Sequence, residues 1–163
     1  LAAIYLLKDW RQVLILVTAF TIGHSLTLAL SSFRVITVNT ELVEFLIPIT
    51  IMITAFTNLF QKKFTAKTIR INYFLALFFG LIHGLAFSNY IRFSIADDQS
   101  IGWSLFGFNV GLELGQIVVV LAILLLAHVI VSIFKVSRRD WVLFLSAGVF
   151  ALALKMVIDR FPT

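Results

Sequence analysis

Long apolar runs separated by short polar breaks dominate the chain. Five runs approach or exceed the length needed to cross a bilayer: residues 12–33, 43–60, 71–90, 101–125 and 141–158. A hydrocarbon core of ~30 Å requires ~20 helical residues, and the fourth run continues as far as residue 134. The polar breaks are too short to fold as separate domains. The pattern therefore predicts an all-α, polytopic transmembrane helical bundle that forms one domain over residues 1–163.

Residues 1–7 are nearly all apolar but too few to span a membrane. A secretory signal peptide would need a positive first region and a cleavage site, and this segment has neither. We therefore expect it to be the end of a further transmembrane helix that lies upstream of Leu1.

Composition agrees with a membrane protein. Hydrophobic residues make up 61% of the chain, the mean hydropathy is +1.05, and only 13% of residues are charged, against about 25% in soluble domains. The chain has no cysteine, so any metal ligands must be nitrogen or oxygen atoms. The net charge of +5 comes mainly from short loops, which favours a role in membrane orientation over nucleic-acid binding.

The distribution of Lys and Arg predicts the orientation. If the five runs alternate in direction, nine of these residues lie on one side of the membrane and four on the other. The more basic side is expected to be cytoplasmic. Loops 61–70 and 135–140 should then be cytoplasmic, and the C-terminus should lie outside.

Glu113 is the most unusual residue, because it lies deep inside the fourth apolar run. A charged side chain at mid-bilayer costs roughly 2.5–3.5 kcal/mol even on lenient scales, so such residues usually face a polar interior and have a function. Asn109 and Gln116 share its helical face through i, i+4, i+7 spacing. Three glycines occupy roughly the opposite face with a spacing that allows a neighbouring helix to approach closely: Gly107, Gly111 and Gly115.

Two histidines lie at a similar expected depth in other runs. His24 has hydroxyl residues within one helical turn, and His83 is flanked by Gly80 and Gly84, which would leave room around its ring. Glu44, near the outer end of the second run, is either a guard of the outer entrance or an ordinary acidic residue at a helix N-terminus.

Imidazole and carboxylate ligands together suit nickel, zinc, cobalt or iron. Proton relays in membranes use the same residue types. Residue chemistry alone therefore leaves a metal pathway and a proton pathway open.

Three segments resemble the HupE/UreJ family of bacterial membrane proteins: FTIGHSLTL at 20–28, GLIHGLAF at 80–87 and FNVGLELGQ at 108–116. The resemblance covers residues 1–125. It implies a nickel or cobalt permease of the bacterial inner membrane, of a family associated with hydrogenase and urease gene clusters. It also implies a further helix upstream of Leu1 that carries a histidine and an Asp-His pair. The site residues that it implies are His24, His83, Asn109, Glu113 and Gln116, and less directly Glu44.

We therefore expect a permease, not an enzyme, that moves a divalent transition metal, with nickel favoured over cobalt or zinc. Its expected partners are the lipid bilayer and the metal ion, with no nucleic acid, and a homo-oligomer stays open. Two alternatives remain: a metal-dependent intramembrane hydrolase, in which Glu113 activates water, and a structural or assembly subunit of a membrane complex.

Overall fold

The chain folds into five long helices and two short helical segments in a computed structural model that describes residues 4–60, 66–94 and 101–161. The long helices are α1 (Trp10–Ser32), α2 (Thr40–Phe60), α3 (Ala66–Ser94), α4 (Ile101–His128) and α5 (Arg138–Asp159). A short 3-10 helix, η2 (Leu7–Asp9), precedes α1, and a π-helical segment, η3 (Val129–Ile133), follows α4. These described ranges contain no strand.

All five long helices are long and apolar enough to span a membrane, which confirms the predicted fold class. The fourth helical stretch continues through η3 to Ile133, as the apolar run predicted. α3 begins five residues before the predicted run and ends four after it, so residues 66–70 and 91–94 are helix rather than loop. Hydropathy marks only the part of a helix that lies in lipid. The helix itself can extend beyond the apolar run until turn-forming residues end it.

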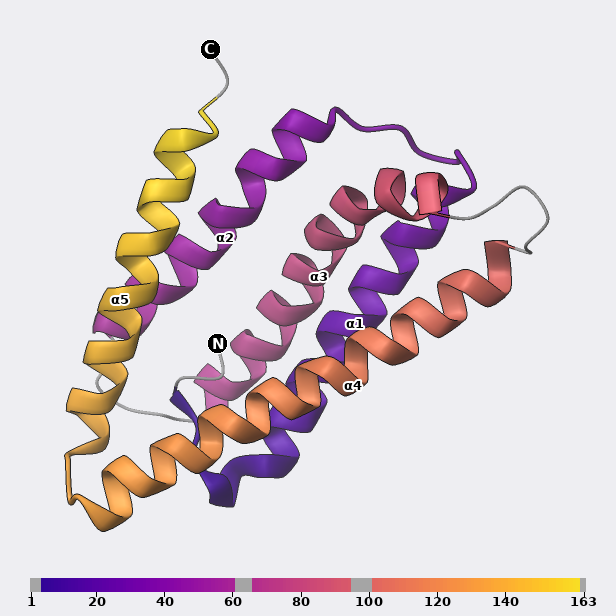
Figure 1. Cartoon of the computed structure of the whole chain (residues 1–163). Coiled ribbons are helices and arrows are strands. Elements are labelled where there is room, and N and C mark those ends of the chain that lie inside the picture. The colour runs from indigo at the N-terminus through magenta and orange to yellow at the C-terminus, as the bar shows by residue number, and fades with distance from the viewer. Residues whose placement is uncertain (1–3, 61–65, 95–100, 162–163) are drawn as a thin grey trace.

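The helices form two groups. α1 and α3 make the most extensive contact, and α4 packs on α1. α2 packs mainly on α5, and a smaller α2–α3 contact joins the two groups. Figure 1 shows α2 beside α5 on one side of the bundle, while α4 and α5 diverge from the turn that connects them.

Glycines bring α1 and α3 into backbone contact. A Cβ atom on Gly23 would lie 2.3 Å from the carbonyl oxygen of Leu77. A Cβ on Gly80 would lie 2.2 Å from the carbonyl oxygen of Phe20, and one on Gly84 would lie 2.2 Å from that of His24. The α1 backbone thus fills the space beside these two α3 glycines. The sequence had predicted that this space would accommodate the ring of His83.

The glycines of α4 have no such neighbour, so the prediction of a tight helix contact there was wrong. A Cβ on Gly107, Gly111 or Gly115 would meet no atom within 4 Å in the part of the chain that is described. The reason is that α4 meets α1 through the face of Glu113 and Gln116, and the glycines lie elsewhere on its circumference.

The segment before α1 packs into the bundle. Ile4 and Tyr5 are buried in an apolar cluster with residues of α1, α3, α4 and α5. The Asn72 amide donates a hydrogen bond to the Tyr5 hydroxyl at 3.3 Å, the Arg138 guanidinium donates to the carbonyl of Ile4, and burial raises the pKa of the Tyr5 phenol. Tyr5 and Leu6 are not helical. Residues 1–3 lie outside the described residues, so the helix expected upstream of Leu1 stays a prediction.

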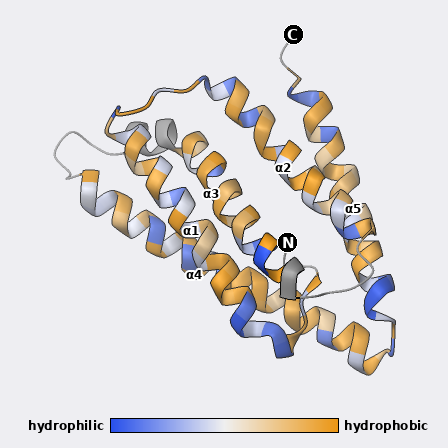
Figure 2. Cartoon of the chain, turned by 180° about the vertical axis from the view of Figure 1, so that it is seen from behind, coloured by the Kyte–Doolittle hydropathy of each residue, from blue (hydrophilic) through white to orange (hydrophobic). Residues whose placement is uncertain are grey.

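The outer surface of the bundle is hydrophobic. Large apolar side chains such as Phe74, Trp103 and Phe144 are largely exposed, and Figure 2 shows hydrophobic residues over most of each helix, with hydrophilic ones concentrated near the ends. A surface of this kind matches the hydrocarbon of a bilayer.

Gly80→Ala should destabilise the protein, because its new Cβ would collide with the α1 backbone. Overpacking of this kind costs about 1–3 kcal/mol. Gly107→Ala is the matched control: it meets no neighbour, and alanine is favoured over glycine in a helix by about 1 kcal/mol. Thermal unfolding in detergent should show a lower Tm for Gly80→Ala and an equal or higher Tm for Gly107→Ala. Equal Tm values for Gly80→Ala and the parent chain would contradict the α1–α3 backbone contact.

Candidate functional site

His24 lies in the interior of the bundle among aromatic rings. Only 1% of its surface is exposed. Its ring lies nearly parallel to those of Phe20 and Phe108, with centroids 6.1 Å and 6.0 Å away, and Phe87 lies 5.7 Å away at a steeper angle. Neither ring nitrogen has a hydrogen-bond partner among the described residues. A buried polar group left unpaired costs about 1–3 kcal/mol, so a site of this kind is suited to a ligand.

Asn109 of α4 lies beside His24. Its amide nitrogen donates to the carbonyl of Leu105 at 2.8 Å, which fixes the side chain against its own helix. Its Oδ1 atom is buried and has no partner in the described structure. The Asn109 side chain and the His24 ring are thus close enough to interact, although no hydrogen bond of normal geometry joins them in the described structure.

His83 of α3 is held by its own helix. Its Nδ1 lies 2.7 Å from the carbonyl oxygen of Phe79. Because a carbonyl can only accept, Nδ1 carries the proton and Nε2 carries the lone pair. A backbone carbonyl bonded to one ring nitrogen is the arrangement that orients a histidine for metal binding through the other. Phe20 contacts this ring as well, with centroids 5.2 Å apart, so it touches both histidines.

Glu113 and Gln116 of α4 bond to α1 through two threonines. The Thr18 hydroxyl donates to Glu113 Oε1 at 2.8 Å, and the Thr21 hydroxyl donates to Gln116 Oε1 at 3.1 Å. The first bond lies at the exposed edge of the α1–α4 contact and the second is partly buried. The polar face that the sequence predicted for α4 therefore packs against another helix. Thr18 is the partner that sequence reasoning missed.

Glu44 lies apart from the histidines. Its side chain is exposed in the second turn of α2, where its carbonyl oxygen accepts a hydrogen bond from Arg160 at 3.2 Å. The N-terminal cap of α2 is Asn39, whose side-chain oxygen accepts from the backbone of Glu41 at 2.8 Å. Glu44 thus lies at one end of the bundle, near the C-terminal end of α5.

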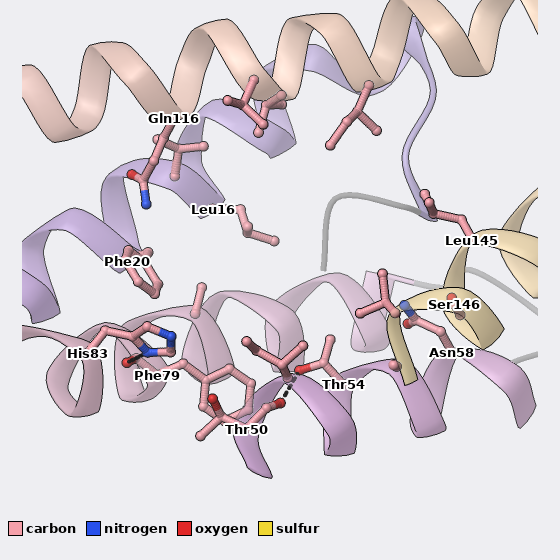
Figure 3. A pocket seen from close by; sticks show the side chains of 18 of the residues that line it. Leu16, Phe20, Thr50, Thr54, Asn58, Phe79, His83, Gln116, Leu145 and Ser146 are labelled. Carbon is pink, nitrogen blue, oxygen red and sulfur yellow. Dashed lines mark hydrogen bonds between the residues drawn. The ribbon is translucent and has the colours of Figure 1, made fainter. Parts of the chain in front are cut away.

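A cavity of ≈ 600 Å³, partly open to the outside of the bundle, adjoins His83. All five long helices contribute to its wall, which is mostly apolar. Figure 3 shows His83 and Gln116 at one end, with Asn58 and Ser146 at the other. Its polar lining residues are Thr50, Thr54, Asn58, His83, Gln116 and Ser146. Sequence reasoning missed four of these, although the first three follow a helical spacing of i, i+4, i+8 within an apolar run.

The structure brings some of the predicted ligands together and not others. The two histidines meet across Phe20, Asn109 adjoins His24, and Gln116 shares the cavity with His83. Within residues 4–60, 66–94 and 101–161, no three His, Asp or Glu side chains are close enough to hold one metal ion. The arrangement therefore offers two imidazoles and amide oxygens as neutral donors, with the Glu113 carboxylate at the neighbouring α1–α4 contact.

The hydrogen bond to Phe79 predicts the tautomer of His83. In protein with nitrogen-15 in its three histidines, NMR should show a protonated Nδ1 and an unprotonated Nε2 for this residue. The resonances can be assigned by their loss in His83→Gln. A protonated Nε2 on His83 would contradict the orientation described here.

The sequence model of the HupE / UreJ protein family matches residues 1–160. No curated protein and no solved structure matches the chain. Because the match covers nearly the whole sequence, the chain belongs to the HupE/UreJ family.

Proposed function

We propose that this HupE/UreJ protein is a permease that carries a divalent transition metal, with nickel as the favoured ion and cobalt or zinc as alternatives. The family is associated with nickel and cobalt transport, and the chain has five helices able to span a membrane. The proposed location is the bacterial inner membrane, with loops 61–70 and 135–140 in the cytoplasm and the C-terminus outside. Transport would run inward.

The observation that carries this proposal is the set of unpartnered donors around His24. The ring nitrogens of His24, one of which carries a lone pair in the neutral ring, and the Oδ1 of Asn109 are buried without partners in the described residues, and the Nε2 lone pair of His83 is left free by the bond to Phe79. Nitrogen and oxygen donors of this kind suit nickel, cobalt and zinc. An ion at this point would satisfy groups that otherwise cost stability.

Neutral ligands also suit transport. Conduction requires a site that binds well enough to admit the ion and weakly enough to release it. Two imidazoles and amide oxygens add no negative charge that would hold a divalent ion permanently. In this proposal Glu113, bonded to Thr18, supplies a compensating negative charge from the adjacent helix contact, and Glu44 attracts cations to the outer entrance.

The two alternatives fit the geometry less well. Catalytic zinc sites use three protein ligands and a water molecule, and the described residues bring no three His, Asp or Glu side chains together. A cluster whose only task is to join helices would have its polar atoms bonded to one another. The ring nitrogens of His24 and the Oδ1 of Asn109 have no hydrogen bond of normal geometry within the described structure.

Loss of either proposed metal-site group should slow nickel uptake strongly. Cells that produce His83→Ala or Glu113→Gln should accumulate radioactive nickel at least about tenfold more slowly than the parent, which corresponds to about 1.4 kcal/mol. His128→Ala is the matched control, because His128 is exposed on the last turn of α4 and bonds only to Ser132 among the described contacts. Its uptake should equal that of the parent. Normal nickel uptake by both His83→Ala and Glu113→Gln would refute the permease assignment at this site.

A further inference from the structure

A strip of polar side chains runs along the wall of the cavity. Thr50, Thr54 and Asn58 are buried on one face of α2 at a spacing of four residues, and all three line the cavity. Figure 3 shows the two threonines between the His83 end and the Asn58 end. We name Thr50, Thr54 and Asn58 of α2, together with Ser146 of α5, the polar strip.

The threonine hydroxyls present acceptors to the cavity. Thr50 Oγ1 donates its proton to the carbonyl of Ile47 at 2.7 Å, and Thr54 Oγ1 donates to the carbonyl of Thr50 at 2.9 Å. Each proton is therefore engaged by the backbone, while the oxygen keeps two lone pairs as acceptors. Acceptors of this kind bind either water protons or a cation directly.

Ser146 adds a second helix, α5, to the polar part of the wall. Only 2% of this residue is exposed, and its Oγ is buried without a hydrogen-bond partner in the described structure. It lines the same cavity as the α2 residues. A hydroxyl left unpaired in an apolar interior is costly, which marks Ser146 as a polar position in the wall.

The polar strip leads from the His83 end of the cavity toward the basic end of the bundle. Asn58 lies in the last turn of α2, where the Arg139 guanidinium donates hydrogen bonds to the carbonyls of Asn58 and Leu59. Arg139 belongs to the segment 135–140, on the side that the positive charges predict to be cytoplasmic. The other end of the cavity is formed by His83 and Gln116.

We propose that the cavity is the inner half of the permeation path, where a divalent metal ion leaving the histidines is held with its water shell by the polar strip. The inference rests on the proposed function and extends it to residues that the family match does not identify. A cavity of ≈ 600 Å³ has room for about twenty water molecules at ~30 Å³ each, enough for an ion with a complete inner hydration shell. Apart from His83 and Gln116 at one end, the remaining wall is apolar and offers no ligand, so the ion is bound through its waters and remains mobile.

Thiol labelling tests whether the cavity is hydrated, and the absence of native cysteine makes each introduced thiol unique. Thr54→Cys and Ser146→Cys are the test variants. Thr57→Cys and Ala147→Cys are their matched controls, because these positions lie on the same helices at similar depth but are exposed on the outer surface and do not line the cavity. The probe is a cationic, membrane-impermeant methanethiosulfonate, added to right-side-out and to inverted vesicles.

We expect the probe to label Thr54→Cys and Ser146→Cys, to leave both controls unlabelled, and to react more slowly when nickel is added. If the test cysteines stay unlabelled from both sides but react after denaturation, the cavity holds lipid chains and the proposal is overturned. Equal labelling of test and control positions would overturn it as well, because the probe would then reach the thiols without passing through the cavity.

An uptake assay separates this inference from the proposed function. Thr54→Val keeps the shape of the side chain and removes the hydroxyl, so nickel uptake should fall about fivefold, the factor for one ordinary hydrogen bond. Thr57→Val should leave the rate unchanged, and Thr54→Ser should restore it. Parental uptake in Thr54→Val and Ser146→Ala would overturn the polar strip and leave the permease intact. A parent chain without nickel uptake would instead overturn the permease, while labelling would still report on water in the cavity.

Discussion

The backbone contact between α1 and α3 is the constraint on which the rest of the structure depends. In a bilayer, lipid chains are as apolar as the side chains, so helices associate through close packing and interhelical hydrogen bonds rather than through the hydrophobic effect. Gly23, Gly80 and Gly84 permit that packing because a Cβ at any of them would collide with the opposing backbone. The contact fixes His24 on α1 against the helix that carries His83, and it leaves little freedom to either ring.

The same contact explains why the interior contains unsatisfied polar atoms. Once α1 and α3 are fixed, the His24 ring is enclosed by Phe20, Phe87 and Phe108, which have no polar atoms to offer its nitrogens. Such a site is rigid, has apolar surroundings and contains ligand atoms without partners. These properties suit the reversible binding of an ion. The proposed role of Glu113 fits this arrangement, because its bond to Thr18 holds the side chain at the α1–α4 contact without making it a ligand.

The sequence predicted the membrane helices and the polar residues that are candidates for a functional site, because both are recognised from local properties of the chain. Hydropathy reports the transfer of a helix into lipid, and Glu113, His24 and His83 stand out because polar groups are rare in such helices. The helix pairing was not predictable in the same way. Gly107, Gly111 and Gly115 have the same spacing as glycines that pack, yet no neighbouring helix approaches them closely in the described structure. The polar strip was overlooked because threonine and serine are ordinary in membrane helices, and only the fold shows that Thr54 and Ser146 share a cavity.

The most direct test of the account is whether His24 and His83 bind one ion together. X-ray absorption spectroscopy of the nickel-loaded protein in membranes or detergent counts the imidazole rings around the metal through their outer-shell scattering. The account predicts nitrogen and oxygen ligands that include two imidazoles in the parent chain and one in His83→Ala. A nickel ion with no imidazole, or with the same imidazole count after His83 is replaced, would contradict the claim that the α1–α3 contact assembles the metal site.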